Sequence, residues 1–197
     1  MLLERGIAVS YETIRRLGQE VRTDLCRRLR RKPPRPTDIW HLDEVVVTIS
    51  GKNHWLWRAV DQDGYVLDEI VRTCRDTMAT KLLLTLLLKQ QGMAAKRITT
   101  VKLGSYAAAH GQVMPRVEHR SHKGLNNKAE NSHLLLRKRE RMMQGFRSVG
   151  GLQRFTSVFA AVINLFIPPR SLRSTLAAHV CRLRVMAVWK AAAGVLA

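Results

Sequence analysis

Between residues 39 and 73 the apolar positions follow the pattern of β-strands rather than of helices. Three apolar runs rich in β-branched and aromatic residues occupy residues 39–50, 54–61 and 65–73. The first two are separated by a Ser-Gly-Lys-Asn turn, and the last two by Asp-Gln-Asp-Gly-Tyr, in which Gly64 can adopt a positive φ. Because both connections are short, the pattern predicts three antiparallel strands in a meander.

After Asp76 the apolar spacing becomes helical and remains so until Gly92. The sequence then predicts alternating elements, namely a buried strand, a short helix, a further short strand and a long helix, over residues 97–101, 104–112, 114–119 and 128–144. Antiparallel strands followed by alternating helices and strands are typical of an α/β fold with a mixed sheet and helices on both faces.

The outer parts of the chain have a different pattern. Residues 1–25 are expected to be helical, with Ser10 as an N-cap, and resemble a helix-turn-helix whose first helix is cut short. Three prolines then predict a linker. Further helices are expected at 152–166 and from about 174 to 190. We therefore divide the chain into an N-terminal helical DNA-binding remnant, a linker, a core and a helical extension, at residues 1–31, 32–38, 39–147 and 148–197.

The charge is strongly unbalanced, with 34 Lys and Arg against 15 Asp and Glu and a net charge of +19. Such an excess favours nucleic acid through phosphate contacts, and six cations cluster in residues 26–35 and four in residues 137–141. No apolar run is long enough for a membrane span, and three scattered cysteines suit a reduced cytoplasmic setting. The expected DNA-binding side chains are Arg15, Arg16, Arg27, Arg28, Arg30, Arg31, Lys102, Arg137, Lys138, Arg139 and Arg141.

Two carboxylates are candidates for chemistry. Asp43 lies in the middle of an apolar strand, where a charge is costly unless it is paired or metal-bound. Pairing with a nearby Arg and a functional role are equally compatible with that position. Glu44 points to the opposite face and is expected to be solvated or salt-bridged.

Glu130 begins the long helix, among polar residues suited to orienting ligands or phosphates, namely Asn127, Asn131 and His133. Glu130 and His133 have the ExxH spacing, which places both on one helix face. A di-iron site would need that motif twice, and it occurs once. His119 and His122 lack further ligands at zinc spacing and are expected to be exposed polar residues.

The motifs WHLDE, LWRAVDQDG, ITTVKLGSY, NNKAENSH, RKRERMM and GFRS, in this order, resemble the small bacterial insertion-sequence transposases of the DDE class. The resemblance covers nearly the whole chain and implies a ribonuclease-H-like catalytic core. It also implies an Asp-Asp-Glu set holding two divalent metals, usually Mg²⁺ or alternatively Mn²⁺. Asp43 matches the first Asp and Glu130 matches the Glu, whereas the second Asp position holds Val101.

The resemblance further implies double-stranded DNA as partner, both terminal inverted repeats and target DNA, a homo-oligomer on DNA, and a nucleoid location without membrane contact. Val101 cannot coordinate a metal, so we expect impaired cleavage in a chain that resembles a family member truncated at its N terminus. Three alternatives are a working recombinase with another ligand, a non-catalytic DNA-binding regulator or inhibitor, and a pseudogene product.

Overall fold

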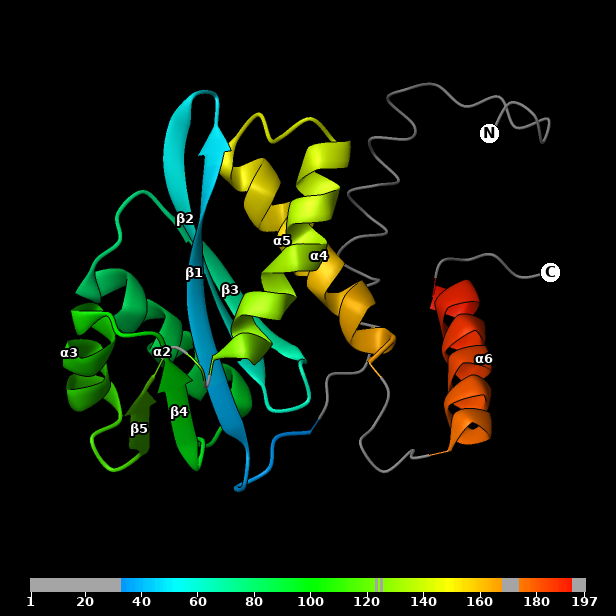
Figure 1. The fold of residues 1–197 in the computed structure, drawn as a ribbon, viewed down its shortest axis with the longest axis horizontal. Coiled ribbons are helices and arrows are strands. Elements are labelled where there is room, and N and C mark those ends of the chain that lie inside the picture. Colours follow the sequence, from blue (N-terminus) through cyan, green and yellow to red (C-terminus); the bar gives the residue numbers. More distant parts are fainter. Residues whose placement is uncertain (1–32, 123, 125, 168–173, 193–197) are drawn as a thin grey trace.

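The computed structural model describes residues 33–122, 124, 126–167 and 174–192. Its centre is a five-stranded mixed sheet with the strand order β3-β2-β1-β4-β5 (Figure 1). The antiparallel half consists of β1 (Ile39–Ile49), β2 (Lys52–Asp61) and β3 (Val66–Arg72). The parallel half adds β4 (Arg97–Thr100) beside β1 and β5 (Glu118–Ser121) beside β4. The predicted meander and mixed α/β sheet are confirmed.

The local turn chemistry explains where the strands end. Ser50 and Gly51 both have positive φ, 49° and 77°, in the hairpin between β1 and β2. Gly64, at φ 92°, turns the chain into β3. The strand expected at residues 114–119 lies instead at Glu118–Ser121. Pro115 lies in a turn there, and proline has no N–H for a strand ladder, so pairing starts later than the apolar pattern suggested.

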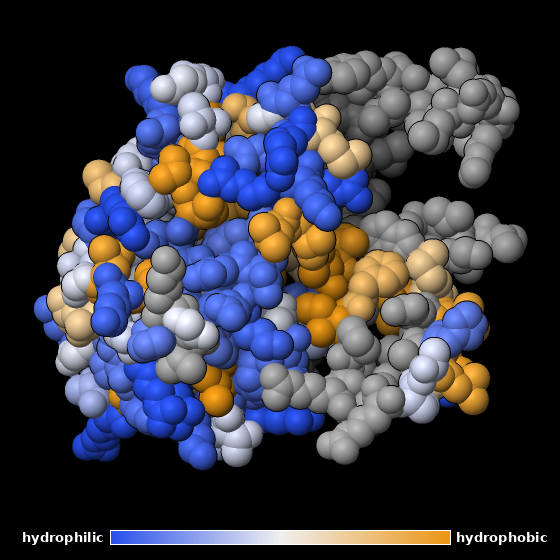
Figure 2. Space-filling view, viewed as in Figure 1, coloured by the Kyte–Doolittle hydropathy of each residue, from blue (hydrophilic) through white to orange (hydrophobic). Residues whose placement is uncertain are grey.

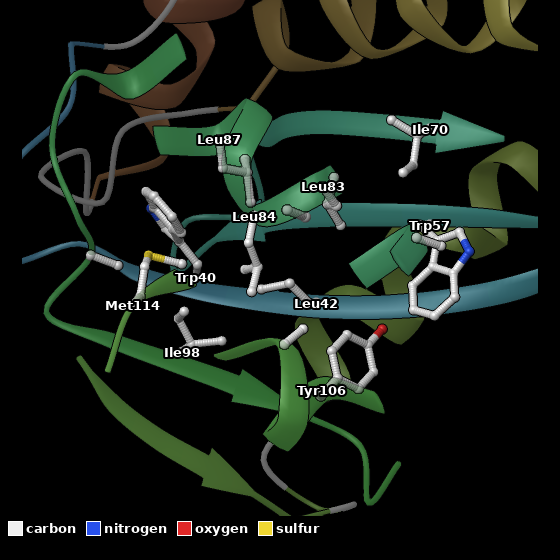
Figure 3. Close-up of a cluster of buried hydrophobic side chains, with 14 residues drawn as sticks. Trp40, Leu42, Trp57, Ile70, Leu83, Leu84, Leu87, Ile98, Tyr106 and Met114 are labelled. Carbon is white, nitrogen blue, oxygen red and sulfur yellow. The ribbon is translucent and has the colours of Figure 1, made fainter. Parts of the chain in front are cut away.

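Helices α2 (Thr77–Gln91) and α3 (Gly104–Val113) cover one face of the sheet (Figure 1). Helix α2 starts where the Asp76 side chain accepts a hydrogen bond from the Ala79 N–H, and ends at left-handed Gly92. Its buried face meets even-numbered residues of β1 in the larger apolar cluster (Figure 3), which includes Trp40, Leu42, Trp57, Leu83, Leu84, Leu87, Ile98 and Tyr106.

Helices α4 (Asn127–Met142) and α5 (Val149–Leu165) lie on the opposite face. They pack on the alternate residues of β1 and β2 in a second cluster formed by Val47, Ile49, Leu56, Leu136 and Leu152. Because side chains alternate along a strand, Asp43 belongs to this face and Glu44 to the face of α2 and α3.

Helix α5 follows residue 147, where we placed the end of the core. Its polar side chains form hydrogen bonds with backbone groups of the edge strand β3. The Gln153 side chain accepts a hydrogen bond from the Val71 N–H at 2.8 Å and donates one to the Glu69 carbonyl at 2.9 Å. The Asn164 side chain bonds both the N–H and the carbonyl of Val66, each at 2.8 Å. These contacts occupy backbone groups that an open sheet edge would leave available.

Helix α6 (Thr175–Ala192) completes the described chain, close to the helical tail that the sequence predicts. The helix-turn-helix predicted in residues 1–31 lies outside the described residues. None of the helices in the described ranges combines the length and apolar character that crossing a bilayer requires.

A buried ion pair joins the sheet to α4. The Arg58 and Glu69 side chains are 1% and 3% exposed and approach to 2.8 Å across β2 and β3. The Arg58 guanidinium also donates to the Ser132 carbonyl in α4 at 2.7 Å. Asp43 faces Arg58 from the other neighbouring strand, so three charged residues form one row across the sheet beneath α4.

We expect Arg58→Met to destabilise the protein by about 3–5 kcal/mol, because the Glu69 charge would remain buried without its partner. The double variant Arg58→Met/Glu69→Leu removes both charges and should recover most of this loss. Chemical denaturation of the three proteins measures both quantities. A single variant as stable as the parent would show that the pair does not hold α4 on the sheet.

Candidate metal and DNA site

The parallel pairing of β1 with β4 brings the first two positions of the predicted carboxylate set together. Leu42 pairs with Thr100 in the last matched register position. The next residues along the two strands are Asp43 and Val101. Strand β4 ends here while β1 continues to Ile49, so the chain leaves β4 at the level of Asp43.

The start of α4 is fixed to the same point of β1. The buried Asn126 side chain donates a hydrogen bond to the Leu42 carbonyl at 2.8 Å. Glu130 follows in the first turn of α4 and is exposed, whereas His133 is buried. The His133 Nε2 atom lies 3.6 Å from Asp43 Oδ2. Helix α4 thus presents Glu130 and His133 toward Asp43, while Asn127 and Asn131 are exposed.

The Asp43 carboxyl lies in an environment that disfavours its charge. Burial, followed by the neighbouring Glu44 and then Glu130, raises the pKa of Asp43 to about 7. Its side chain is 13% exposed. Arg58, which faces Asp43 in register, bonds Glu69 and the Ser132 carbonyl instead. A cation beside Asp43 would therefore relieve an existing electrostatic cost.

Glu44 is fully buried on the other face, where it is salt-bridged as the sequence analysis allowed. It accepts hydrogen bonds from the Arg75 guanidinium and from the Tyr106 hydroxyl. Burial, and next the Glu44 charge, raise the pKa of Tyr106 well above its ordinary value. Tyr106 belongs to α3, so this bond ties the helix that follows position 101 to the strand that carries Asp43.

His133 is a neutral imidazole in this environment. Burial, with smaller contributions from the Arg58 and Arg137 charges, lowers the pKa of His133 to about 3. Its contact with Asp43 is consequently not an ion pair at neutral pH. Neither ring nitrogen makes a hydrogen bond within the described part of the chain.

Position 101 contributes packing instead of a ligand. The half-buried Val101 side chain packs against the cluster on the face of α2 and α3. Its carbonyl accepts hydrogen bonds from the hydroxyls of Thr100 at 3.0 Å and Ser121 at 3.2 Å. Among the described residues, no group of three His, Cys, Asp or Glu side chains is already arranged around a common metal position.

The predicted DNA-binding cations lie in two places. Lys102, Lys138, Arg139 and Arg141 are exposed. Arg137 is partly buried and pairs with Glu140 at 3.1 Å. Hydrophilic side chains cover much of the molecular face that includes α4, with apolar patches between them (Figure 2). The remaining predicted cations lie outside the described residues, namely Arg15, Arg16, Arg27, Arg28, Arg30 and Arg31.

The expectation for one of the two histidines is wrong. His119 is half-buried, stacks on His110 with ring centroids 5.0 Å apart, and bonds the Thr100 hydroxyl at 2.9 Å, so it is not an exposed polar residue. The sequence analysis also missed Arg75 and Tyr106 as partners of Glu44. No local sequence signal links them, because they come together only when α2 and α3 pack on β1.

Comparison with known proteins identifies the family. Residues 37–167 match the family described as a DDE domain. The chain belongs to the DDE transposases of bacterial insertion sequences. It is 30% identical over 153 residues to the transposase for insertion sequence-like element IS431mec of Staphylococcus aureus, covering 75% of this chain and 68% of that protein. It is 29% identical, with the same coverage, to the transposase for insertion sequence element IS257 in transposon Tn4003 of Staphylococcus aureus.

One solved structure shares the fold of this transposase-family chain. A chain in the structure of the simian T-cell lymphotropic virus intasome in complex with PP2A regulatory subunit B56 gamma superposes with a TM-score of 0.50 at 14% identity. The match covers 66% of this chain and 49% of that one, so this chain spans about half its length. The HTLV-2 integrase catalytic core domain in complex with magnesium gives a TM-score of 0.46 at 14% identity, covering 68% and 88%.

We expect Asp43→Asn to stabilise the metal-free protein at high pH but not at low pH. The folded protein keeps the Asp43 proton up to a pKa of about 7, whereas an unfolded Asp loses it near 3.8. Stability should therefore fall as pH rises between these values, and Asn, which has no charge, should abolish that fall. The expected gain is roughly 1–4 kcal/mol at about pH 8 and close to zero at about pH 4.

Chemical denaturation in chelator across this pH range measures the effect. Glu118→Gln is the control, because the hydrogen bonds from Arg97 and Arg120 lower the pKa of Glu118. Removing the Glu118 charge should therefore give no gain in stability at high pH. A parallel pH profile for Asp43→Asn and the parent would contradict the environment described for Asp43.

Proposed function

We propose that this chain is a DNA-binding insertion-sequence transposase whose metal-dependent strand cleavage and strand transfer are impaired at position 101. The observation that supports this proposal is the β1–β4 register, whose last pair, Leu42 and Thr100, directly precedes Asp43 and Val101 in the two segments. Asp43 and Glu130 are the catalytic carboxylates in this proposal. The alternative is a non-catalytic regulator of transposition. Such a regulator would also bind DNA but would have no residual strand-cleavage activity.

The side chains around Asp43 do not fit a pair of magnesium ions. Two-metal phosphoryl chemistry requires carboxylates that bridge and flank both cations, and Mg²⁺ demands oxygen ligands in near-octahedral geometry. Asp43 and Glu130 supply carboxylate oxygens, but the third position offers an isopropyl group that packs into the core. We therefore assign no reaction step to such a metal pair here.

DNA binding is the part of the function that the charges support. The exposed cations of α4 follow Glu130 on the same helix, so a duplex lying along α4 would pass the carboxylates. Phosphate contacts of this kind position DNA without reading its sequence. The terminal inverted repeats of the element and target DNA are the proposed substrates, and a homo-oligomer bound to DNA is the proposed assembly.

Duplex DNA binding should weaken steeply with salt, because each phosphate contact releases counterions. The triple variant Lys138→Gln/Arg139→Gln/Arg141→Gln should bind unrelated duplexes more weakly by a similar factor and show a shallower slope of log affinity against log salt. Fluorescence anisotropy over a salt series measures both. The control, Arg72→Gln/Lys89→Gln/Lys96→Gln, removes the same charge from exposed positions on β3, on α2 and before β4.

Equal losses of DNA affinity in the two triple variants would mean that the net charge of the protein, rather than the cations of α4, determines DNA affinity. Neutralising Arg27, Arg28, Arg30 and Arg31 in the full chain tests the second cluster and should likewise weaken all duplexes alike.

Restoring the third carboxylate should create a magnesium-dependent gain in stability. In chelator, Val101→Asp should be less stable than the parent, because three acidic groups in one cleft repel each other. Magnesium should reverse this loss, since a ligand that binds only the folded state stabilises it, by roughly 2.7 kcal/mol at a concentration 100 times its Kd. The parent should gain little stability from magnesium.

Thermal unfolding with and without Mg²⁺ measures the effect. Val101→Asn is the matched control, because the Asn side chain has nearly the same shape as Asp without the charge. This variant should show no magnesium-dependent gain in stability. Equal magnesium stabilisation of the parent and of Val101→Asp would place residue 101 away from the metal site and overturn the proposal.

A further inference from the structure

Helix α4 carries exposed apolar side chains among its cations. Leu134 is 58% exposed and Leu135 is 46% exposed, whereas Leu136 is buried against the sheet. A single exposed leucine is ordinary on a protein surface. Leu134 differs because it lines an open hollow of about 620 Å³ on the surface of the molecule. The other described residues that line this hollow are Arg137, Glu140, Arg141, Gln144 and Gly145.

The hollow continues the line of Glu130 along α4. An α-helix has 3.6 residues per turn, so positions i, i+4, i+7 and i+11 share one face. On α4 these positions are Glu130, Leu134, Arg137 and Arg141. A DNA strand that follows this face from the carboxylate meets Leu134 after one turn, about 6 Å along the helix axis, and reaches the guanidinium groups only after that.

The hollow carries a positive charge that an anionic ligand can use. Among its described lining residues the acid is Glu140, whose carboxylate accepts a hydrogen bond from the Arg137 guanidinium at 3.1 Å. The Arg141 side chain is exposed and bonds the Arg137 carbonyl at 3.4 Å, which leaves its charge available. A ligand that fills the hollow should therefore combine an apolar surface with a negative charge.

An unpaired nucleotide has both properties. In an intact duplex the faces of the bases are stacked on one another, and a leucine beside the duplex meets sugars and phosphates. An unstacked base exposes a flat apolar face, which proteins cover with apolar side chains, including leucine, or with the plane of an arginine. The phosphate of the same nucleotide is a good partner for a guanidinium. The hollow thus matches an unpaired nucleotide better than it matches paired DNA.

We propose that this hollow binds one unpaired nucleotide of the DNA strand that passes Glu130, with the base against Leu134 and the phosphate at Arg141. This inference rests on the proposed function in requiring that DNA lies along α4. The exposed cations of α4 supply affinity for any duplex, and Leu134 adds a preference for DNA whose base pairing is open beside Glu130. Leu134 is therefore a specificity-determining residue for the form of the DNA rather than for its sequence.

The test compares the binding of two DNA probes to the full chain. One probe is a fully paired duplex, and in the other the terminal base pairs are replaced by mismatches, so the two probes carry the same charge. Fluorescence anisotropy should show roughly tenfold tighter binding of the mismatched probe by the parent. Leu134→Ser should reduce this preference to less than about twofold and leave the affinity for the paired duplex unchanged.

Leu135→Ser is the matched control, because it removes an exposed leucine of the same helix that does not line the hollow. It should keep the preference for the mismatched probe. Both leucines are exposed, so neither substitution should lower the unfolding temperature. A cross-link tests the same contact in the parent. A 5-iodouracil base in the mismatched end should cross-link to residues 134–145, as mass spectrometry of the digested protein would show.

Three results would overturn this inference alone. They are equal affinity of the parent for the two probes, equal loss of the preference in both leucine variants, and cross-links confined to other segments. A preference that survives Leu134→Ser would overturn it as well and would favour a protein partner with acidic and apolar residues at the hollow. The proposed function would stand in each case, because paired-duplex binding and the magnesium response of Val101→Asp test it separately. No binding of either probe by the parent would overturn both. If Leu134→Ser fails to fold, the cross-link decides.

Discussion

The Arg58–Glu69 pair is the interaction on which the rest of the site depends. Arg58 lies at the centre of a sheet face, 1% exposed, and its guanidinium is bonded both to Glu69 on β3 and to the Ser132 carbonyl of α4. Burying a charge there is costly, and the bonds that Arg58 makes to both elements offset part of that cost while attaching α4 to the sheet. Because Arg58 is committed to these partners, Asp43 on the adjacent strand keeps a carboxylate that can serve another purpose.

The chain order and the sheet topology explain why distant residues meet beside that carboxylate. A parallel β1–β4 pair requires a crossover, here through α2, and it pairs Leu42, the residue before Asp43, with Thr100, the residue before position 101. Asn126 then attaches the start of α4 to the carbonyl before Asp43. Val at position 101 is compatible with this frame, because Val is well suited to the end of a buried strand.

The sequence predicted the elements whose signals are local. Asp76 and Gly92 mark both ends of α2, and the glycine turns mark the meander. Family motifs singled out Asp43, Val101 and Glu130. The sequence could not predict that Glu44 would bond Tyr106, nor that Arg58 would bond Glu69 rather than Asp43. These pairings depend on strand register and helix packing. Pro115 delayed β5 because a missing backbone donor outweighs apolar character.

The bond between Asn126 and the Leu42 carbonyl has a mechanical consequence. It holds the start of α4 against the carbonyl that precedes Asp43, so the backbone that carries Glu130 and His133 is attached to the sheet at this point. The far end of α4, with its exposed Lys138, Arg139 and Arg141, lies several turns further along the helix. Substitutions at those exposed positions can therefore change the charge of that surface without altering the backbone geometry beside Asp43.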